Sequence, residues 1–224
     1  MNFFGENLYK KARKLNLKEF DQFNKDYYRL IEDYDWVKVI KNFSGPESIY
    51  HKLREKTAMA YISLFISDKK NRKILDAGCG TGLILRHLPK NSVGIDINPR
   101  HIEKTKRNTL SNKIVLGDIE KTPFKKNTYD IVVCFETLEH LLFPEKALSE
   151  FKRILKKGGL FIGSVPRKSM LWYLRALSKS HPHNEPFHRE FSEKEIFLLV
   201  SKSFKIQKIK KEIFGLNFFF VANA

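Results

Sequence analysis

Residues 74–82 read ILDAGCGTG, an apolar run that leads into a loop with three glycines. The run is short and apolar without alternation, which is typical of a strand buried on both faces. In parallel α/β sheets, ligands bind in the crevice beyond the carboxyl ends of the strands. Glycines at such a point allow positive φ angles and a close approach of the backbone to a ligand. The stretch therefore predicts a binding site for a nucleotide-type cofactor.

Four more apolar runs of the same kind follow, and helical patterns separate them. The expected strands are residues 93–95, 114–116, 131–133 and 160–162, and the expected helices lie near residues 83–88, 99–109 and 144–155. This rhythm predicts an α/β fold with a doubly wound, mostly parallel sheet of the Rossmann-like kind. Two β-like segments at residues 204–209 and 214–221 bring the expected sheet to seven strands.

The regions that flank these strands are expected to form a cap and a lid on a single domain. Residues 1–45 have a helix-like rhythm and predict an N-terminal helical cap, and residues 46–224 are expected to form the catalytic domain. After the fifth strand, the polar and aromatic residues 166–191 are expected to insert a substrate lid. A helix then restarts at Ser192, because Ser192 and Glu195 have the spacing of a capping box.

The charge and the cysteines bound the class of protein. The 224 residues carry a formal net charge of +17, a pattern compatible with a polyanionic partner. Lysines are spread from Lys10 to Lys211 rather than gathered in one stripe, so a nucleic-acid partner is not favoured. Cys79 and Cys134 have no pair spacing and indicate neither a disulfide framework nor a zinc site. No run reaches the roughly 18 apolar residues of a membrane helix, so we expect a cytoplasmic protein, with peripheral membrane contact left open.

Details of the glycine loop discriminate between cofactors. A nicotinamide fingerprint needs G-x-G-x-x-G, and counting from Gly78 puts Leu83 where the third glycine should stand. Asp76 comes directly before the glycines, where its charge would repel a pyrophosphate and attract a cationic ligand. S-adenosylmethionine carries an ammonium and a sulfonium and no phosphate. The loop therefore favours S-adenosylmethionine over a dinucleotide.

With these landmarks the sequence resembles the class I S-adenosylmethionine-dependent methyltransferases, and in particular their type 11-like members. The motif Leu-Asp-x-Gly-x-Gly-x-Gly implies that Asp76, Gly78 and Gly80 contact the cofactor. Asp96 ends the next strand, and the resemblance implies that its two oxygens accept hydrogen bonds from the ribose hydroxyls. Asp118 matches the position beside the adenine amino group. The spacings between the three aspartates are those of successive βα units.

The stretch after the fourth strand brings acids and a histidine to the crevice. Residues 134–141 read CFETLEHL, and a helical turn there would put Glu136, Glu139 and His140 on one face. His140 is the first candidate for a catalytic base, with Glu139 as its catalytic partner, and Phe135 is expected to line the cofactor site. An alternative remains in which Glu139 caps the helix while His140 packs in place.

Within the class, this stretch most resembles the polyprenyl-catechol O-methyltransferases of ubiquinone biosynthesis. The resemblance implies that Glu136, Glu139 and His140 hold a divalent cation such as Mg²⁺ near the acceptor, where it would lower the pKa of the acceptor hydroxyl. It also implies that Arg54, in the helix before the glycine loop, contacts the cofactor.

The expected lid suggests an apolar wall for the acceptor. Trp172, Tyr173 and Leu174 are candidates for contact with a hydrophobic acceptor, although aromatics at helical spacing are more often core residues. Three nearby histidines lack the partners of a zinc site; they are His181, His183 and His188. We therefore expect methyl transfer to a small molecule, an O-methylation of a phenolic or isoprenoid-linked acceptor. The alternative is an RNA-modifying methyltransferase.

Overall fold

The computed structural model describes residues 15–31, 35–43, 45–66, 68, 71–109, 112–172 and 185–224. Its strands are β1 (Ile74–Ala77), β2 (Val93–Asp96), β3 (Lys113–Leu116), β4 (Tyr129–Phe135), β5 (Leu155–Pro166), β6 (Lys205–Glu212) and β7 (Asn217–Asn223). Its helices are α2 (Leu17–Leu30), α3 (Trp36–Lys41), α4 (Pro46–Phe65), α5 (Pro99–Asn108), α6 (Pro144–Ile154) and α7 (Glu193–Ser201). Short 3₁₀ turns cover Leu85–His87 and Leu138–His140.

The seven strands form one sheet in the order β3-β2-β1-β4-β5-β7-β6. β1 to β5 are parallel to one another, and β7 runs antiparallel to both of its neighbours, β5 and β6. β1 lies between β2 and β4. Strands β2 and β3 follow on one side of β1, and the chain then crosses over to place β4 on its other side. Ligands bind at such switch points, so this topology confirms the predicted doubly wound fold and places a crevice beyond β1.

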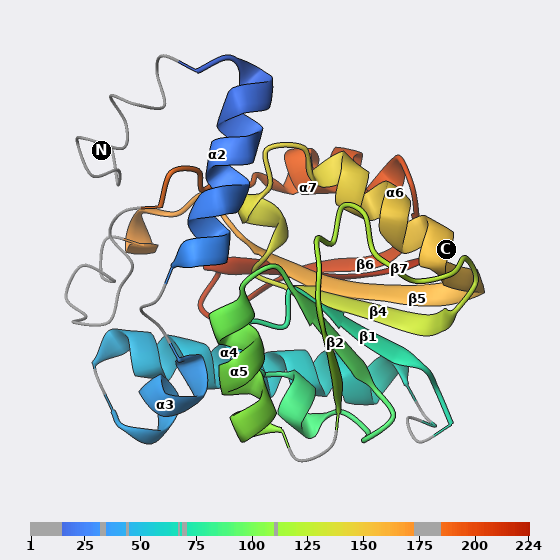
Figure 1. The fold of residues 1–224 in the computed structure, drawn as a ribbon, viewed down its shortest axis with the longest axis horizontal. Helices are drawn as coiled ribbons and strands as arrows, with labels where there is room; N and C mark the ends of the chain where they lie inside the picture. The colour runs from blue at the N-terminus through green and yellow to red at the C-terminus, as the bar shows by residue number, and fades with distance from the viewer. Residues whose placement is uncertain are drawn as a thin grey trace.

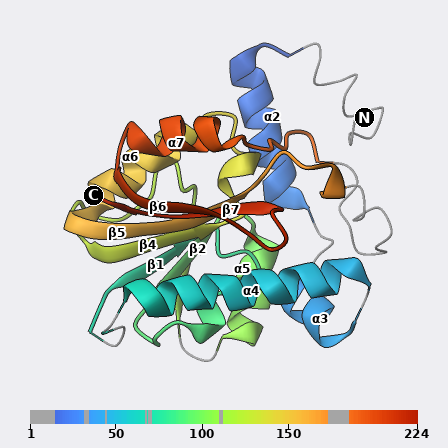
Figure 2. The same ribbon diagram turned by 180° about the vertical axis from the view of Figure 1, so that it is seen from behind.

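Helices cover both faces of the sheet. In Figure 1, α6 and α7 lie above the sheet and α3 and α4 below it, and Figure 2 shows the same layers from behind. β7 contributes side chains to the cores on both faces of the sheet, because alternate side chains of a strand point to opposite faces. Phe218 and Phe220 join the core with α6 and α7, whereas Phe219 and Val221 join the core with α4. All four are almost fully buried.

Local signals explain where several helices begin. Ser192 and Glu195 form the predicted capping box at the start of α7, with each side chain bonded to the other's backbone amide. α2 begins with the same device, built from Asn16 and Glu19. α2 and α3 confirm the expected N-terminal helices, and in Figure 1 α2 stands at the left of the sheet. None of the helices in the described parts of the chain is long and apolar enough to cross a membrane.

Three local expectations were wrong. The expected helix near residues 83–88 is only the 3₁₀ turn Leu85–His87. β3 is not buried on both faces, because it lies at the edge of the sheet and leaves Leu116 56% exposed. β5 begins at Leu155, five residues before the expected strand, because Tyr129 of β4 already pairs with Leu155. Residues 173–184 of the expected lid lie outside the described residues.

Candidate active site

One cavity at the carboxyl ends of the strands brings together the residues that the sequence suggested for the cofactor, for catalysis and for a metal. It lies between the glycine loop after β1 and the turn after β4. Its lining includes the residues predicted for cofactor, catalysis and metal: Arg54, Asp76, Gly78, Gly80, Asp96, Asp118, Phe135, Glu136, Glu139 and His140. These residues come from α4, from the ends of β1, β2, β3 and β4 and from the loops that follow them.

The glycine loop has the backbone that its sequence predicts. Gly78 and Gly80 have φ angles of 74° and 52°, in the left-handed region that side chains with a Cβ rarely adopt. A Cβ on Gly78 would collide with the side chain of Thr137, so this glycine lets the loop after β1 approach the turn after β4. A Cβ on Gly80 would meet nothing within 4 Å, so the requirement there is the backbone conformation.

Asp96 is held in a fixed orientation at the end of β2. Its Oδ2 accepts a 2.8 Å hydrogen bond from the amide of Gly80, and its Oδ1 accepts a 2.9 Å bond from the amide of Asn98. Nδ1 of His101 lies 3.3 Å from the same Oδ1. The side chain is 8% exposed and lines the cavity. A carboxylate fixed in this way is pre-organised to accept further hydrogen bonds from a pair of ligand hydroxyls.

Asp76 carries a buried carboxylate that the described protein only partly satisfies. It is 3% exposed, and its Oδ2 has no hydrogen-bond partner among the described residues. Burial, and then the charge of Asp96, raise the pKa of Asp76 to about 7. A cationic ligand group would stabilise the charged form and reverse this shift. The site therefore fits a ligand with a positive charge at this point.

Arg54 brings the opposite charge into the same cavity from α4. It is 8% exposed, and its Nε has no hydrogen-bond partner among the described residues. Its charge lowers the pKa of Asp76, which places the two groups in electrostatic contact. A zwitterionic ligand end, with one ammonium and one carboxylate, matches this pair. The methionyl end of S-adenosylmethionine has both groups.

Asp118 lies in the cavity but is engaged with α2. Its Oδ2 forms a 2.9 Å ion pair with Nζ of Lys25, and its Oδ1 accepts a 2.8 Å bond from the amide of Glu120. Lys25 also pairs with Glu120 at 2.6 Å. A contact of Asp118 with an adenine amino group would therefore share this carboxylate with Lys25.

Glu136 does not share a helical face with the other two candidates. Its φ of 53° turns the chain before the 3₁₀ turn begins, so the expectation of one common face was wrong. Its carboxylate accepts bonds from Oγ of Ser164 at 2.7 Å, from Oη of Tyr50 at 2.8 Å and from Nδ2 of Asn217 at 2.8 Å. Three donors from β5, α4 and β7 thus satisfy this carboxylate and tie the three elements together.

Glu139 and His140 both lie in the 3₁₀ turn Leu138–His140, at very different depths. Glu139 is 1% exposed, and burial together with the charge of Glu136 raises the pKa of Glu139 well above its usual range. His140 has a side chain that is 20% exposed, and its Nε2 lies 3.9 Å from Oε1 of Glu139. His140 is therefore the better placed of the two to exchange a proton with a ligand.

The possible metal ligands group differently from the expectation. Among the described residues, the set whose ligand atoms lie within 4.8 Å of one another is His140, Glu185 and His188, and Glu136 and Glu139 are not in it. Nδ1 of His140 lies 4.0 Å from Oε2 of Glu185. Two imidazoles and one carboxylate suit a zinc-type ion better than Mg²⁺, which prefers oxygen ligands. The predicted magnesium set is thus not gathered in this structure.

Sequence reasoning missed several residues of the cavity. Asn24 and Tyr28 reach His140 from α2, and Tyr50 reaches Glu136 from α4. The spacing of Asn24 and Tyr28 by four residues on a helix was a usable signal, because such residues share a face. Their distance of more than 110 positions from His140 gave no hint of the contact.

Trp172 is buried against Tyr50, with ring centroids 5.2 Å apart. Among the lid candidates, Tyr173, Leu174, His181 and His183 lie outside the described residues.

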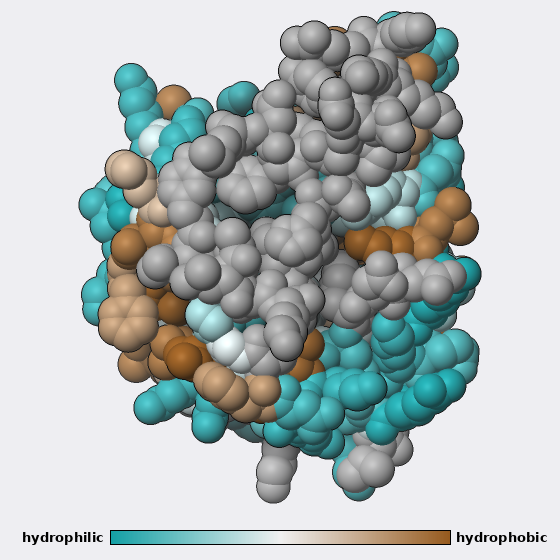
Figure 3. Space-filling view, turned by 90° about the vertical axis from the view of Figure 1, so that its left-hand side faces the viewer, coloured by the Kyte–Doolittle hydropathy of each residue, from teal (hydrophilic) through white to brown (hydrophobic). Residues whose placement is uncertain are grey.

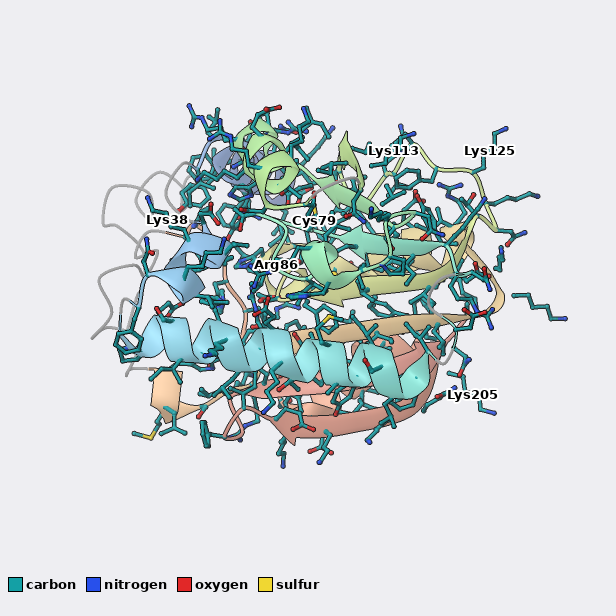
Figure 4. The ribbon with its side chains drawn as sticks, turned by 90° about the horizontal axis from the view of Figure 1, so that it is seen from below. Lys38, Cys79, Arg86, Lys113, Lys125 and Lys205 are labelled. Carbon is teal, nitrogen blue, oxygen red and sulfur yellow. The ribbon has the colours of Figure 1, made fainter. Side chains whose placement is uncertain are left out.

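The two cysteines are buried, and the labelled lysines lie apart from one another. Cys79 and Cys134 are buried free thiols, and burial raises the pKa of both. Figure 4 shows four labelled lysines at well-separated points of the periphery; they are Lys38, Lys113, Lys125 and Lys205.

Comparison with known proteins shows which proteins this chain is similar to. Residues 75–163 match the family described as a methyltransferase domain. The chain is 35% identical over 155 residues to an uncharacterized protein of Methanocaldococcus jannaschii, which covers 66% of this chain and 62% of that protein. It is 30% identical over 164 residues to the sterol 24-C-methyltransferase erg-4 of Neurospora crassa, which covers 66% of this chain and 43% of that enzyme.

A solved structure gives the same fold. The S-adenosylmethionine-dependent methyltransferase from Aquifex aeolicus matches with a TM-score of 0.62 and 20% identity over 85% of this chain and 99% of that one. The chain spans less than two thirds of the length of the two curated relatives. These matches support the predicted methyltransferase class, whereas the finer resemblance to ubiquinone O-methyltransferases is not shown. Residues 75–163 therefore match a methyltransferase domain, and the chain shares the fold of the S-adenosylmethionine-dependent methyltransferase from Aquifex aeolicus.

Proposed function

We propose that this protein transfers the methyl group of S-adenosylmethionine to a hydroxyl of a small-molecule acceptor, with His140 as the general base. The observation that carries the proposal is that His140 lines the same cavity as Asp76 and Asp96. Buried carboxylates that fit a cationic, ribose-bearing ligand thus lie in one cavity with a partly exposed imidazole. The match of residues 75–163 to the methyltransferase domain supports the same cofactor.

S-adenosylmethionine supplies a methyl group that its sulfonium has already activated. The acceptor oxygen forms a bond to the methyl carbon while the carbon–sulfur bond breaks. The electron pair of the broken bond stays on sulfur, which gives S-adenosylhomocysteine. His140 takes the hydroxyl proton. Holding donor and acceptor in line supplies roughly 7 to 11 kcal/mol of barrier reduction, whereas a base contributes about a hundredfold to ten-thousandfold in rate.

The cofactor roles follow from the charges of the cavity. Asp96 would accept hydrogen bonds from the two ribose hydroxyls, and Asp76 with Arg54 would hold the methionyl end. Gly78 and Gly80 would let the backbone lie against the ligand, and Phe135, which is 6% exposed, would form part of the wall.

Aromatic and aliphatic side chains near the cavity support a hydrophobic acceptor, phenolic or isoprenoid-linked. Trp172 packs on Tyr50, which itself lines the cavity. Met170 and Leu171, just before Trp172, are 83% and 45% exposed. Figure 3 looks at the end of the molecule that lies at the left of Figure 1; hydrophobic side chains gather left of its centre and in a smaller group at the right, while hydrophilic ones dominate the lower right. Exposed apolar side chains of this kind suit contact with an apolar acceptor or with a membrane surface.

The magnesium ion, the cytoplasmic location and the small-molecule class of acceptor remain predictions. We derive no step through a metal, because Glu136 is satisfied by protein donors and the gathered set is rich in nitrogen. An RNA acceptor is the second candidate, favoured only by the net charge of +17. Binding to RNA through general charge would weaken steeply with salt.

The test is a transfer assay with S-adenosylmethionine labelled in its methyl group. The purified protein is incubated with cell extract that has been separated into small molecules, RNA and protein. Label in an organic-soluble small molecule supports the proposal. Release of that label by mild base would indicate a methyl ester rather than the methyl ether expected of a phenolic acceptor. Label only in RNA or only in protein would overturn the small-molecule assignment.

A further inference from the structure

Asn98 lies in the loop between β2 and α5, and its side chain is fully buried. Its Oδ1 accepts hydrogen bonds from the amides of Arg100 at 2.8 Å and His101 at 3.3 Å, which caps the start of α5. Its Nδ2 donates to two carbonyl oxygens at the end of α2, those of Tyr28 at 2.9 Å and Ile31 at 2.8 Å. One side chain therefore satisfies backbone groups at the start of α5 and at the end of α2.

An amide side chain provides both the acceptor and the two donors that this position uses. The hydrogens on Nδ2 of Asn98 serve the two carbonyls of α2, and Oδ1 serves the amides of α5. A charged aspartate would have no donor, and a serine would have a single hydroxyl hydrogen. Because a backbone carbonyl can only accept a hydrogen bond, these contacts also fix which way round the amide lies.

The backbone of the same residue holds the carboxylate that we propose for the ribose. The amide of Asn98 donates the 2.9 Å hydrogen bond to Oδ1 of Asp96, while the amide of Gly80 donates to Oδ2. A single residue thus connects the end of α2 with the carboxylate of Asp96. Movement of α2 away from Asn98 would remove two hydrogen bonds from the residue that orients Asp96.

α2 is bonded to the loops after β3 and β4 as well. Nζ of Lys25 forms a 2.9 Å ion pair with Oδ2 of Asp118, and Nδ2 of Asn24 donates a 2.7 Å hydrogen bond to the carbonyl of His140. Asn24 and Lys25 also line the cavity. The loops that follow β2, β3 and β4 are therefore bonded to one helix, which stands at the left-hand end of the sheet in Figure 1.

α2 is not anchored in the hydrophobic cores. In the described parts of the chain, neither core includes a residue of α2, and Asn24 is the buried residue of this helix. Phe20 meets Phe187 edge-on, with ring centroids 6.3 Å apart. Elements with few buried apolar contacts open locally without unfolding of the whole protein. The polar bonds to the three loops therefore make a large contribution to the docking of α2.

We propose that Asn98 is a positioning residue that couples the docking of α2 to the binding of S-adenosylmethionine. Docked α2 holds the residue that orients Asp96, and a cofactor bound to Asp96 in turn stabilises the docked helix. The coupling is reciprocal, so the factor by which the cofactor favours docking equals the factor by which docking favours the cofactor. The inference rests on the proposed cofactor role of Asp96 and needs no acceptor.

Hydrogen exchange of the full chain, followed by mass spectrometry, measures the docking of α2. In the wild-type protein, saturating S-adenosylmethionine should slow the exchange of peptides within residues 17–31 by about tenfold or more. Asn98→Ser keeps an oxygen that caps α5 and removes the amide donors to α2. Without cofactor, its α2 peptides should exchange about tenfold faster than those of the wild-type protein, because two hydrogen bonds are lost.

The ratio of the exchange rates without and with cofactor distinguishes coupling from simple support of the fold. A residue that only stabilises docked α2 would change both rates alike and leave the ratio unchanged. If Asn98 carries the coupling, the ratio in Asn98→Ser should be smaller than in the wild-type protein by about threefold or more. Asn98→Asp, which keeps the capping oxygen and replaces the amide nitrogen, serves the same comparison if Asn98→Ser does not fold.

Asn112→Ser is the matched control. Nδ2 of Asn112 also donates to two backbone carbonyls, those of Pro89 at 2.9 Å and Ser92 at 3.5 Å, and Asn112 is not among the residues that line the cavity. The exchange of α2 in this variant, and its response to S-adenosylmethionine, should match those of the wild-type protein.

Three results would overturn the inference. They are exchange of α2 that does not respond to S-adenosylmethionine although calorimetry shows binding, a ratio in Asn98→Ser equal to that of the wild-type protein, and equal effects of Asn98→Ser and Asn112→Ser on α2. Failure of the proposed function alone would show differently, as a protein whose α2 responds to the cofactor while no fraction accepts a methyl group. Absence of any heat of binding would refute the cofactor site and the coupling together.

Discussion

The two halves of the cavity are built in different ways. The cofactor half, with Asp76, Gly78 and Asp96, comes from the ends of two adjacent parallel strands and the loop between strand and helix. The half around His140 combines α2, the turn after β4 and residues 185–188. Hydrogen-bonded residues in this half are up to 159 positions apart in the sequence. A local motif thus builds the half proposed for the cofactor, whereas long-range packing builds the half proposed for the chemistry.

The largest expected effect concerns the buried charge of the cofactor half. Asp76 has a pKa of about 7 in the folded protein against 3.8 in its ordinary state, so folding favours its protonated form. The contribution of this pKa shift to the free energy of unfolding is fully present below about pH 4 and is lost as the pH rises through about 7. Three pKa units correspond to about 4 kcal/mol, an upper figure for this group. Asp76→Asn should therefore unfold at higher temperature than the wild-type protein at about pH 8, with a smaller difference at about pH 5.

Thermal unfolding of both proteins without ligand measures this difference. S-adenosylmethionine should then raise the unfolding temperature of the wild-type protein and have little effect on Asp76→Asn. An advantage of Asp76→Asn that grows toward acidic pH would show that Asp76 is a stabilising charge rather than a ligand group.

The second effect separates chemistry from binding. His140→Ala should lower kcat by about a hundredfold or more, roughly 2.7 kcal/mol, and leave the affinity for S-adenosylmethionine unchanged. Because a protonated imidazole cannot accept a proton, the rate of the wild-type protein should fall at acidic pH and the variant should lose that dependence. Steady-state rates across pH with calorimetric affinities make the comparison. Loss of cofactor binding in this variant would place His140 in the cofactor half.

The smallest effect concerns the ribose anchor. Asp96→Ala removes a charged acceptor of hydrogen bonds, which costs about 1.5 to 3 kcal/mol, so the affinity for S-adenosylmethionine should fall about tenfold or more. The acid limb of the rate should remain at saturating cofactor. Calorimetry on the folded variant measures the loss, and unchanged affinity would remove Asp96 from the ribose site.

The same contrast explains what the sequence could predict. The glycine loop, the seven strands and the aspartates at strand ends follow from apolar runs and turn chemistry, which act over a few residues. The fate of Glu136 could not be predicted, because its donors Tyr50, Ser164 and Asn217 come from three other elements. The engagement of Asp118 by Lys25 likewise joins positions 93 residues apart. Periodicity does not report such contacts. The prediction that Glu136 and His140 share one face was therefore wrong, whereas the prediction of aspartates at the strand ends was not.

The central claim is that this cavity binds S-adenosylmethionine, and calorimetric titration of the wild-type protein tests it most directly. The account predicts saturable binding of one S-adenosylmethionine per chain and no measurable binding of NAD, because Asp76 repels a pyrophosphate and Leu83 replaces the third glycine of the nicotinamide fingerprint. Absence of S-adenosylmethionine binding, or equal affinity for NAD, would contradict it.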